Sequence, residues 1–144
     1  MQGDYVRLQY PFNTLDLNEI KHDLSTTDLN RQGTVYLAFV KKGNTYEPDF
    51  VTMNRQKINN KTYLKGENFY LTYPALSKEE YFNQTELPSP SLLQVKWGIE
   101  QYYVPEGKGK ELEAKIREGT VYAHLAIYRG KGRVIDLITT TPKD

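Results

Sequence analysis

Short stretches in which apolar and polar residues alternate recur along the whole chain, and they limit its fold more than any other feature. Val6, Leu8 and Tyr10 would share one face of a strand that Pro11 ends. Residues 120–128 (TVYAHLAIY) alternate in the same way. Because successive side chains of a strand point to opposite faces, such segments predict half-buried β-strands. The chain is therefore expected to consist mainly of β-structure.

Further segments bring the expected number of strands to about seven. Residues 34–40 (TVYLAFV) are apolar on both faces, as in a central strand, and residues 41–45 form the turn to the next strand. Gly66 marks a bend or bulge within residues 58–74. We expect a single domain over residues 1–144 with an α+β, mostly β fold. Its antiparallel sheet would curl, or close like a barrel, around a core.

Helical signals are fewer than strand signals. The best helix is expected at residues 108–119 (KGKELEAKIREG), where Leu112 and Ile116 form a narrow apolar stripe and a glycine suits the C-terminal cap. Residues 12–33 contain apolar side chains at helical spacing, which predicts a short helix or helical turn. Residues 77–82 (SKEEYF) predict one further helical turn.

Composition and charge argue against several functional classes. Lys and Arg total 19 and Asp and Glu total 18, so a net charge of +1 gives no global attraction to nucleic acid or an anionic membrane. The absence of cysteine excludes thiol nucleophiles, disulfides and Cys-ligated metals. No segment approaches the roughly 18–20 apolar residues of a membrane span. The 12 tyrosines suit half-buried sheet surfaces, and an aromatic binding platform is the alternative.

The sequence carries no familiar catalytic signature. There is no Gly-x-Ser-x-Gly motif, and His22 and His124 lack the spacing of a metal-binding pair. His124 alternates within an apolar strand, which favours a hydrogen-bonded wall residue over a general base. Residues 107–111 (GKGKE) precede a helix but do not form a phosphate-binding loop. We therefore expect neither a cofactor nor a metal.

Carboxylates are the remaining candidates for chemistry. Asp4 opens the first strand, and Glu100 and Glu106 flank an aromatic run. Two converging carboxylates could act as acid and base or bind a hard cation. The structural alternative is that Asp4 accepts backbone N–H bonds in a turn. Glu106 would then lie in the first turn of the helix, where its negative charge stabilises the helix dipole. The sequence leaves both interpretations open.

Three segments in the same order resemble one protein family. Residues 3–10 (GDYVRLQY) match the pattern Gly-Asp-Tyr-x-x-Leu-x-Tyr. Residues 97–113 (WGIEQYYVPEGKGKELE) are similar to a second, longer block, and residues 64–66 (LKG) to a weaker middle block. These segments span most of the chain and are similar to the bacterial GDYXXLXY family. The strand opening at Gly3 and the bend at Gly66 also resemble the β-rich body of bacterial signal peptidases, although the Ser–Lys dyad motifs of those enzymes are not recognisable.

The resemblance to the GDYXXLXY family implies a cellular location rather than a reaction. Members usually carry an N-terminal membrane helix before the motif and expose the domain outside the cytoplasmic membrane. Many are encoded near multi-pass membrane proteins. The present sequence is thus expected to be the soluble part of a membrane-tethered protein. We expect a non-enzymatic binding or accessory module with a neighbouring multi-pass membrane protein as partner. A carboxylate-dependent envelope hydrolase, with or without a metal, is the alternative.

A candidate site follows if the first and second motif blocks meet in space. Three carboxylates would then ring a pocket with tyrosine walls. The candidate binding residues are Asp4, Tyr5, Glu100, Tyr102, Tyr103, Pro105, Glu106 and Gly107. The alternative is that the glycines and the proline only fix turns while the tyrosines pack in the core. Self-association through an exposed strand edge is a third hypothesis.

Overall fold

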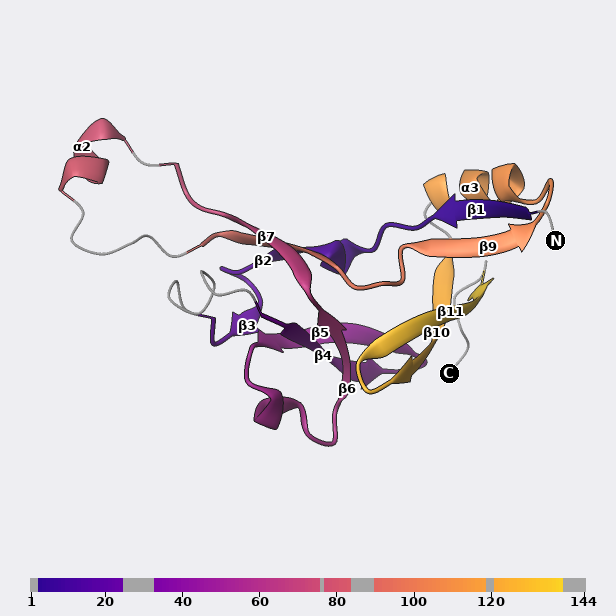
Figure 1. The fold of residues 1–144 in the computed structure, drawn as a ribbon, viewed down its shortest axis with the longest axis horizontal. Coiled ribbons are helices and arrows are strands. Elements are labelled where there is room, and N and C mark those ends of the chain that lie inside the picture. Colours follow the sequence, from indigo (N-terminus) through magenta and orange to yellow (C-terminus); the bar gives the residue numbers. More distant parts are fainter. Residues whose placement is uncertain (1–2, 25–32, 76, 84–89, 119–120, 139–144) are drawn as a thin grey trace.

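The computed structural model describes residues 3–24, 33–75, 77–83, 90–118 and 121–138. In these segments antiparallel strands predominate, as expected. The strands of these described segments form four separate sheets, however, and the sheets are not closed into a barrel. Figure 1 shows the two larger sheets one above the other, with the smaller ladders continuing to one side. The part of the prediction that allowed a closed barrel is therefore wrong.

The largest sheet has the order β3(Lys21–His22), β5(Thr45–Thr52), β4(Val35–Lys42), β6(Thr62–Gly66). Strand β4 lies at its centre and is antiparallel to both neighbours, which confirms the central strand predicted from its apolar residues. Its turn to β5 passes through Gly43 at φ 64°, a left-handed conformation that glycine adopts without a steric penalty. The short β3 adds to the edge in parallel with β5.

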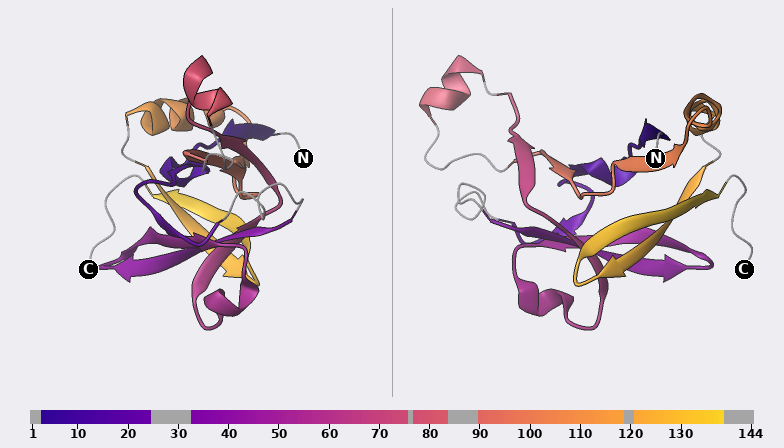
Figure 2. Two further views of the ribbon diagram at one scale, coloured as in Figure 1. Left: turned by 90° about the vertical axis from the view of Figure 1, so that its left-hand side faces the viewer. Right: turned by 45° about the vertical axis from the view of Figure 1, so that its right-hand side comes forward.

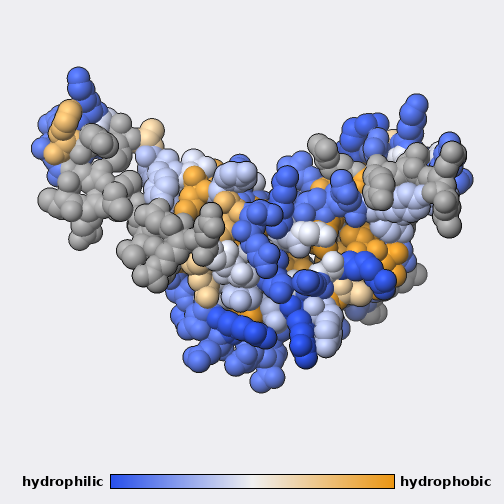
Figure 3. All heavy atoms as spheres, viewed as in Figure 1, coloured by the Kyte–Doolittle hydropathy of each residue, from blue (hydrophilic) through white to orange (hydrophobic). Residues whose placement is uncertain are grey.

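A second sheet has the order β2(Thr14–Asp16), β8(Leu92–Lys96), β7(Asn68–Thr72). The main core lies between it and the largest sheet, and alternate residues of both contribute to it. Figure 3 shows hydrophilic residues over much of the face turned to the viewer, with apolar residues exposed in several areas between them. The buried residues of the main core are Leu15, Leu17, Leu24, Val35, Leu37, Val51, Leu64, Leu93, Val95, Trp97 and Ile99.

Gly66 is the point where the chain leaves the largest sheet and enters the second one. It ends β6, and β7 begins two residues later in the other sheet. Gly66 is buried, and a Cβ atom there would overlap the side chain of Val95 and lie 3.1 Å from the Trp97 ring. The bend predicted at this residue is confirmed, and its physical reason is a close approach between the two sheets.

The remaining ladders enclose a second core. Strand β1(Gly3–Arg7) pairs with β9(Gln101–Pro105), and α3(Gly109–Arg117) packs along β1 (Figure 1). The helix confirms the prediction at residues 108–119, although the predicted cap Gly119 lies outside the described residues. The hairpin of β10(Tyr122–Tyr128) and β11(Lys131–Ile138) also contributes. The second core contains Val6, Leu8, Tyr102, Val104, Leu112, Ile116, Val134 and Leu137.

Two predicted helical segments differ in outcome. Residues 77–82 do form a helical turn, α2(Lys78–Phe82), in which the Ser77 hydroxyl accepts the Glu80 N–H at 3.1 Å. Figure 1 shows α2 at the end of an extended arm, away from both sheets. In the described part of residues 12–33 the expected helix is replaced by short strands, the 3-10 turn η1(Pro11–Asn13), and a turn in which the Asp16 carbonyl accepts two N–H groups.

The helices that the structure describes include none with the length and apolar character needed to cross a membrane.

A polar cluster fastens the end of β3 to the 3-10 helix η2(Arg55–Ile58). The Asp23 carboxylate accepts the Thr52 hydroxyl at 2.8 Å and the Lys57 ammonium at 2.6 Å. The Thr52 oxygen in turn accepts the Asn54 N–H at 2.9 Å. Partial burial favours the neutral form of Asp23, but the hydrogen bonds and charge of Lys57, with the bond from Thr52, outweigh it and lower the pKa of Asp23.

This shift predicts a stability contribution that acid removes. Because the pKa of Asp23 is lower in the folded state, its contribution is complete above the ordinary carboxyl pKa of about 3.9 and disappears as the pH falls through the folded value. Both side chains of the ion pair are partly exposed, so we expect less than about 1 kcal/mol. Urea unfolding from pH 6 to pH 2 should show the wild type losing its advantage over Asp23→Asn. A difference independent of pH would contradict the assignment.

Candidate functional site

The two motif segments, nearly one hundred positions apart in the sequence, form one antiparallel ladder. Strand β1 pairs with β9 from Gly3 opposite Pro105 to Arg7 opposite Gln101. The pairing continues one step beyond the strands, where the Leu8 N–H donates to the Glu100 carbonyl at 2.7 Å. The segments therefore lie adjacent, as the site hypothesis required.

Tyr10, the last residue of the first motif, joins the ladder to the main core. Its hydroxyl donates to the Ile99 carbonyl at 2.8 Å. Its ring stacks on Phe12 with centroids 5.1 Å apart, and Phe12 meets Phe39 edge to face at 5.2 Å. Burial, and then the charge of Glu100, raise the pKa of Tyr10 far above its usual value. The hydroxyl therefore remains a neutral hydrogen-bond donor at any physiological pH.

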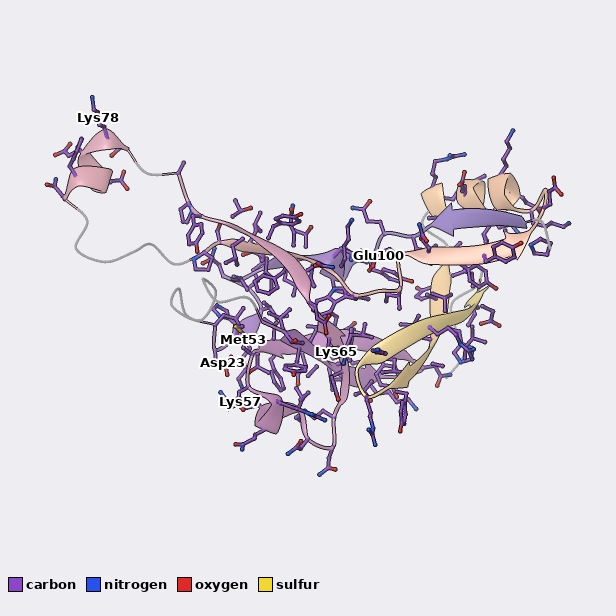
Figure 4. All side chains as sticks on the ribbon, viewed as in Figure 1. Asp23, Met53, Lys57, Lys65, Lys78 and Glu100 are labelled. Atoms are coloured by element: carbon purple, nitrogen blue, oxygen red, sulfur yellow. The ribbon has the colours of Figure 1, made fainter. Side chains whose placement is uncertain are left out.

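Glu100, labelled in Figure 4, occupies the loop between β8 and β9, and its carboxylate closes that loop. One oxygen accepts the Gly98 N–H at 2.9 Å, and the other accepts the Trp97 N–H at 3.0 Å. The second oxygen also lies 3.2 Å from the Asn13 amide nitrogen, which donates to it. Gly98 has φ +87°, a conformation that suits glycine and lets the loop fold around the carboxylate.

Asn13 and Trp97 complete this arrangement, which we call the motif junction (Tyr10, Asn13, Trp97 and Glu100). The Asn13 amide also donates to the Val95 carbonyl at 2.9 Å, and its side-chain oxygen accepts the Tyr10 N–H at 2.7 Å. The Trp97 indole N–H donates to the Phe12 carbonyl at 3.0 Å. Both carboxylate oxygens of Glu100 are thus held by donors of the chain itself. The geometry supports a locking role for Glu100 better than a role as acid or base.

Replacing Glu100 by glutamine should destabilise the fold. An amide presents N–H groups where a carboxylate oxygen now accepts, so at least one backbone donor loses its partner. We expect the free energy of unfolding to fall by about 1–2 kcal/mol. Urea unfolding followed by circular dichroism measures this change, and exposed Glu106→Gln serves as the control. Equal stability of the two variants would show that the junction does not depend on the carboxylate.

Pro105, Glu106 and Gly107 make the turn from β9 to α3. The Lys108 N–H donates to the Pro105 carbonyl at 3.1 Å, and Gly107 has φ +90°. These features are typical of a type II turn, which requires a positive φ at its third position. Glu106 is exposed in this turn, and the acidic residue in the first turn of α3 is Glu111. The expected place of Glu106 in the helix is therefore wrong.

The other candidate residues lie along the ladder. Asp4 is opposite Val104 within the first strand, so the alternative that placed it in a turn is wrong, and Tyr5 is opposite Tyr103. The side chains of Asp4 and Tyr5 lie outside the described part of the structure. Adjacent residues of a strand face opposite sides, so Tyr102 packs in the second core while Tyr103 is 39% exposed. The Tyr102 hydroxyl donates to the Ile135 carbonyl at 3.3 Å.

The ladder does not bring the three carboxyl-bearing residues together. Asp4 and Glu106 belong to one end, and Glu100 belongs to the other end, four residues or about 13 Å along the strand from Asp4. A shallow, open depression of about 300 Å³ lies instead beside α3, and none of the candidate residues lines it. This separation argues against one pocket ringed by all three carboxylates. A binding role for the individual residues remains a prediction.

The histidines take part in local contacts. The His22 ring nitrogen accepts the Leu24 N–H at 3.1 Å. His124 lies 3.1 Å from the Asp136 carboxylate, but its side chain is 55% exposed, so it does not form a wall as predicted. Across the segments that the structure describes, no three His, Asp or Glu side chains converge in a way that could hold a metal ion.

Sequence reasoning missed two of the four junction residues. Asn13 falls in a polar segment with no local signal, and Trp97 stands out in the sequence only as the first residue of the second block. The charge of Glu100 and the place of Tyr10 in the first motif do indicate the other two. Only the contacts between distant segments show that these four side chains act together.

Comparison with known proteins supplies the family. A family model described as GDYXXLXY protein matches residues 1–137, which is nearly the whole chain. No curated protein and no solved structure matches the chain. The resemblance to signal peptidases therefore remains a prediction.

Proposed function

The chain belongs to the GDYXXLXY family, and on that premise we propose that it is a binding or accessory module of a bacterial membrane system. In this proposal the domain is tethered to the cytoplasmic membrane and works on its extracytoplasmic side. It acts beside a multi-pass membrane protein and catalyses no reaction itself.

The proposal is supported by the observation that described motif side chains make hydrogen bonds within the protein itself. The carboxylate of Glu100 accepts hydrogen bonds from three N–H groups of its own chain, and the Tyr10 hydroxyl donates a hydrogen bond to a backbone carbonyl. Tyr10 and Glu100, one from each motif block, thus hold the β8–β9 loop against the segment that links β1 to β2. A rigid scaffold of this kind supports function through the surface it presents.

The absence of cysteine allows a direct test of the location. Asn44→Cys places one thiol in the exposed turn between β4 and β5 of the full-length protein. In cells of the native bacterium, a membrane-impermeant maleimide should label this thiol without lysis, after permeabilisation of any outer membrane. Val51→Cys, at a fully buried position, is the matched control and should react only after denaturation.

Two outcomes would contradict the proposal. Labelling of Asn44→Cys only after the cytoplasmic membrane is broken would place the domain in the cytoplasm. Hydrolysis of an envelope substrate by the purified protein, abolished by Glu106→Gln while the fold is retained, would establish the carboxylate-dependent hydrolase instead.

A further inference from the structure

The solvent-facing side of the β10–β11 hairpin carries a distinctive set of side chains. Residues on its other side, among them Leu125, Ile127 and Val134, pack against the cores. Figures 1 and 2 show the hairpin on the outside of the molecule, next to β6. We call the exposed side the hairpin face, and its polar and aromatic side chains are those of Tyr122, His124, Tyr128, Lys131, Arg133 and Asp136. The small Ala126 lies among them, and Ile135, at the bulge of β11, is also 44% exposed.

Close packing holds this hairpin on the body of the protein. The Lys65 N–H, from a residue labelled beside the hairpin in Figure 4, donates to the Gly130 carbonyl at 2.9 Å. A Cβ at Gly130 would lie 2.6 Å from the Tyr63 ring, and one at Gly132 would lie 2.8 Å from Ile99. The backbone is therefore seated directly on its neighbours, and the hairpin face is preformed.

Positive charge is concentrated on this hairpin. Residues 122–138 contain Arg129, Lys131, Arg133 and one acid, Asp136, which gives 3 − 1 = +2 with His124 neutral. The whole chain carries +1, so the rest of it carries 1 − 2 = −1. The Asp136 carboxylate is also engaged by the His124 ring at 3.1 Å. The hairpin therefore presents a local excess of cations on a nearly neutral protein, and two of these cations, Lys131 and Arg133, lie on the hairpin face.

Aromatic rings lie at both ends of the face. Tyr128 is 72% exposed, and the Arg129 guanidinium lies 5.2 Å from its ring centroid. Tyr122, six residues away or about 20 Å along the strand, is 39% exposed. Between them the small residue Ala126 lies directly opposite Arg133, and the Arg133 side chain is exposed.

We propose that the hairpin face binds an anionic polysaccharide. This choice of partner follows from the proposed function at the cell envelope, on which the inference rests. Lys131 and Arg133 lie two residues apart on one strand, about 7 Å, and would pair with successive carboxylate or phosphate groups. The exposed faces of Tyr122 and Tyr128 would stack on sugar rings at the two ends. Charge complementarity supports an anionic partner, and the 20 Å spacing of the rings supports an extended one.

Binding is tested with the purified domain by calorimetric titration. Alginate supplies a carboxylated polymer and poly(glycerol phosphate) a phosphorylated one, while dextran is the neutral control. We expect at least one anionic polymer to bind and dextran not to bind. Lys131→Glu/Arg133→Glu should weaken that binding at least about tenfold, and Tyr128→Ala should weaken it with no change in charge.

A second double variant tests whether a loss of binding follows from the change in net charge alone. Lys96→Glu/Lys110→Glu changes the net charge by the same amount at two other exposed lysines and should alter the affinity by less than about twofold. Circular dichroism checks that each variant is folded. Equal losses in the two double variants would overturn the proposal, because binding would then follow net charge alone.

Other results would also overturn it. These are no binding to either anionic polymer, or stronger binding to single-stranded DNA or to vesicles of phosphatidylglycerol than to the polysaccharides. The cysteine-labelling experiment separates the two proposals. An extracytoplasmic domain that binds no polysaccharide would refute only this inference, whereas a cytoplasmic domain would refute the proposed function whatever the titrations show.

Discussion

Replacing Trp97 by alanine is expected to produce the largest loss of stability among single substitutions at the motif junction, about 3–5 kcal/mol in the free energy of unfolding. The side chain is 3% exposed and belongs to the main core. It lies against Gly66 and donates its indole N–H to the Phe12 carbonyl. Alanine would leave a cavity between the two sheets and an unpaired carbonyl. Urea unfolding followed by far-ultraviolet circular dichroism measures the loss.

Two controls separate the contributions of Trp97. Trp97→Phe keeps most of the ring and loses the indole donor, so it should cost less than alanine does. Tyr70→Ala removes an aromatic ring that is 73% exposed and should change stability by about 0.5 kcal/mol or less. A Trp97→Ala variant as stable as Tyr70→Ala would contradict the position of Trp97 between the sheets.

Adding a single methyl group at Gly66 is expected to have the second-largest effect. In Gly66→Ala the new Cβ would overlap Val95 and crowd the Trp97 ring at 3.1 Å. Val95 is itself 2% exposed and part of the main core, so it has little room to move. We expect a loss of about 3 kcal/mol, at the upper end of the usual range for overpacking. Trp97 is the only tryptophan, so its fluorescence reports both unfolding and any local displacement.

Gly33→Ala is the matched control for this substitution. Among the residues that the structure describes, its new Cβ would meet only the terminal methyl of Met53, at 3.0 Å, and that flexible side chain can move away. Its φ angle is not positive, so alanine is tolerated and the change should be nearly neutral. If Gly66→Ala and Gly33→Ala were equally stable, the close approach between the sheets at Gly66 would be refuted.

Local patterns of apolar residues predicted helices and strands well where the segment itself determines its secondary structure. The apolar segment at residues 34–40 became the central β4, and the half-buried Leu112 and Ile116 form the side of α3 that packs on the second core. The same kind of pattern failed within residues 12–33, where a helix was predicted. There Leu17 and Leu24 are at helical spacing, but they reach the main core from strands and turns. Spacing records which side chains are buried, but two leucines can reach one core from several backbone paths.

The sequence by itself determined the family, the predominance of strands and the bend at Gly66, because each depends on residue order or on a local conformational preference. Only the tertiary structure decided how the motif residues are used. Asn13 contacts Glu100, and Tyr10 contacts Ile99, across more than eighty intervening residues. The same holds for the position of the β10–β11 hairpin beside β6. Such contacts depend on how distant strands pair and pack, which no local pattern specifies.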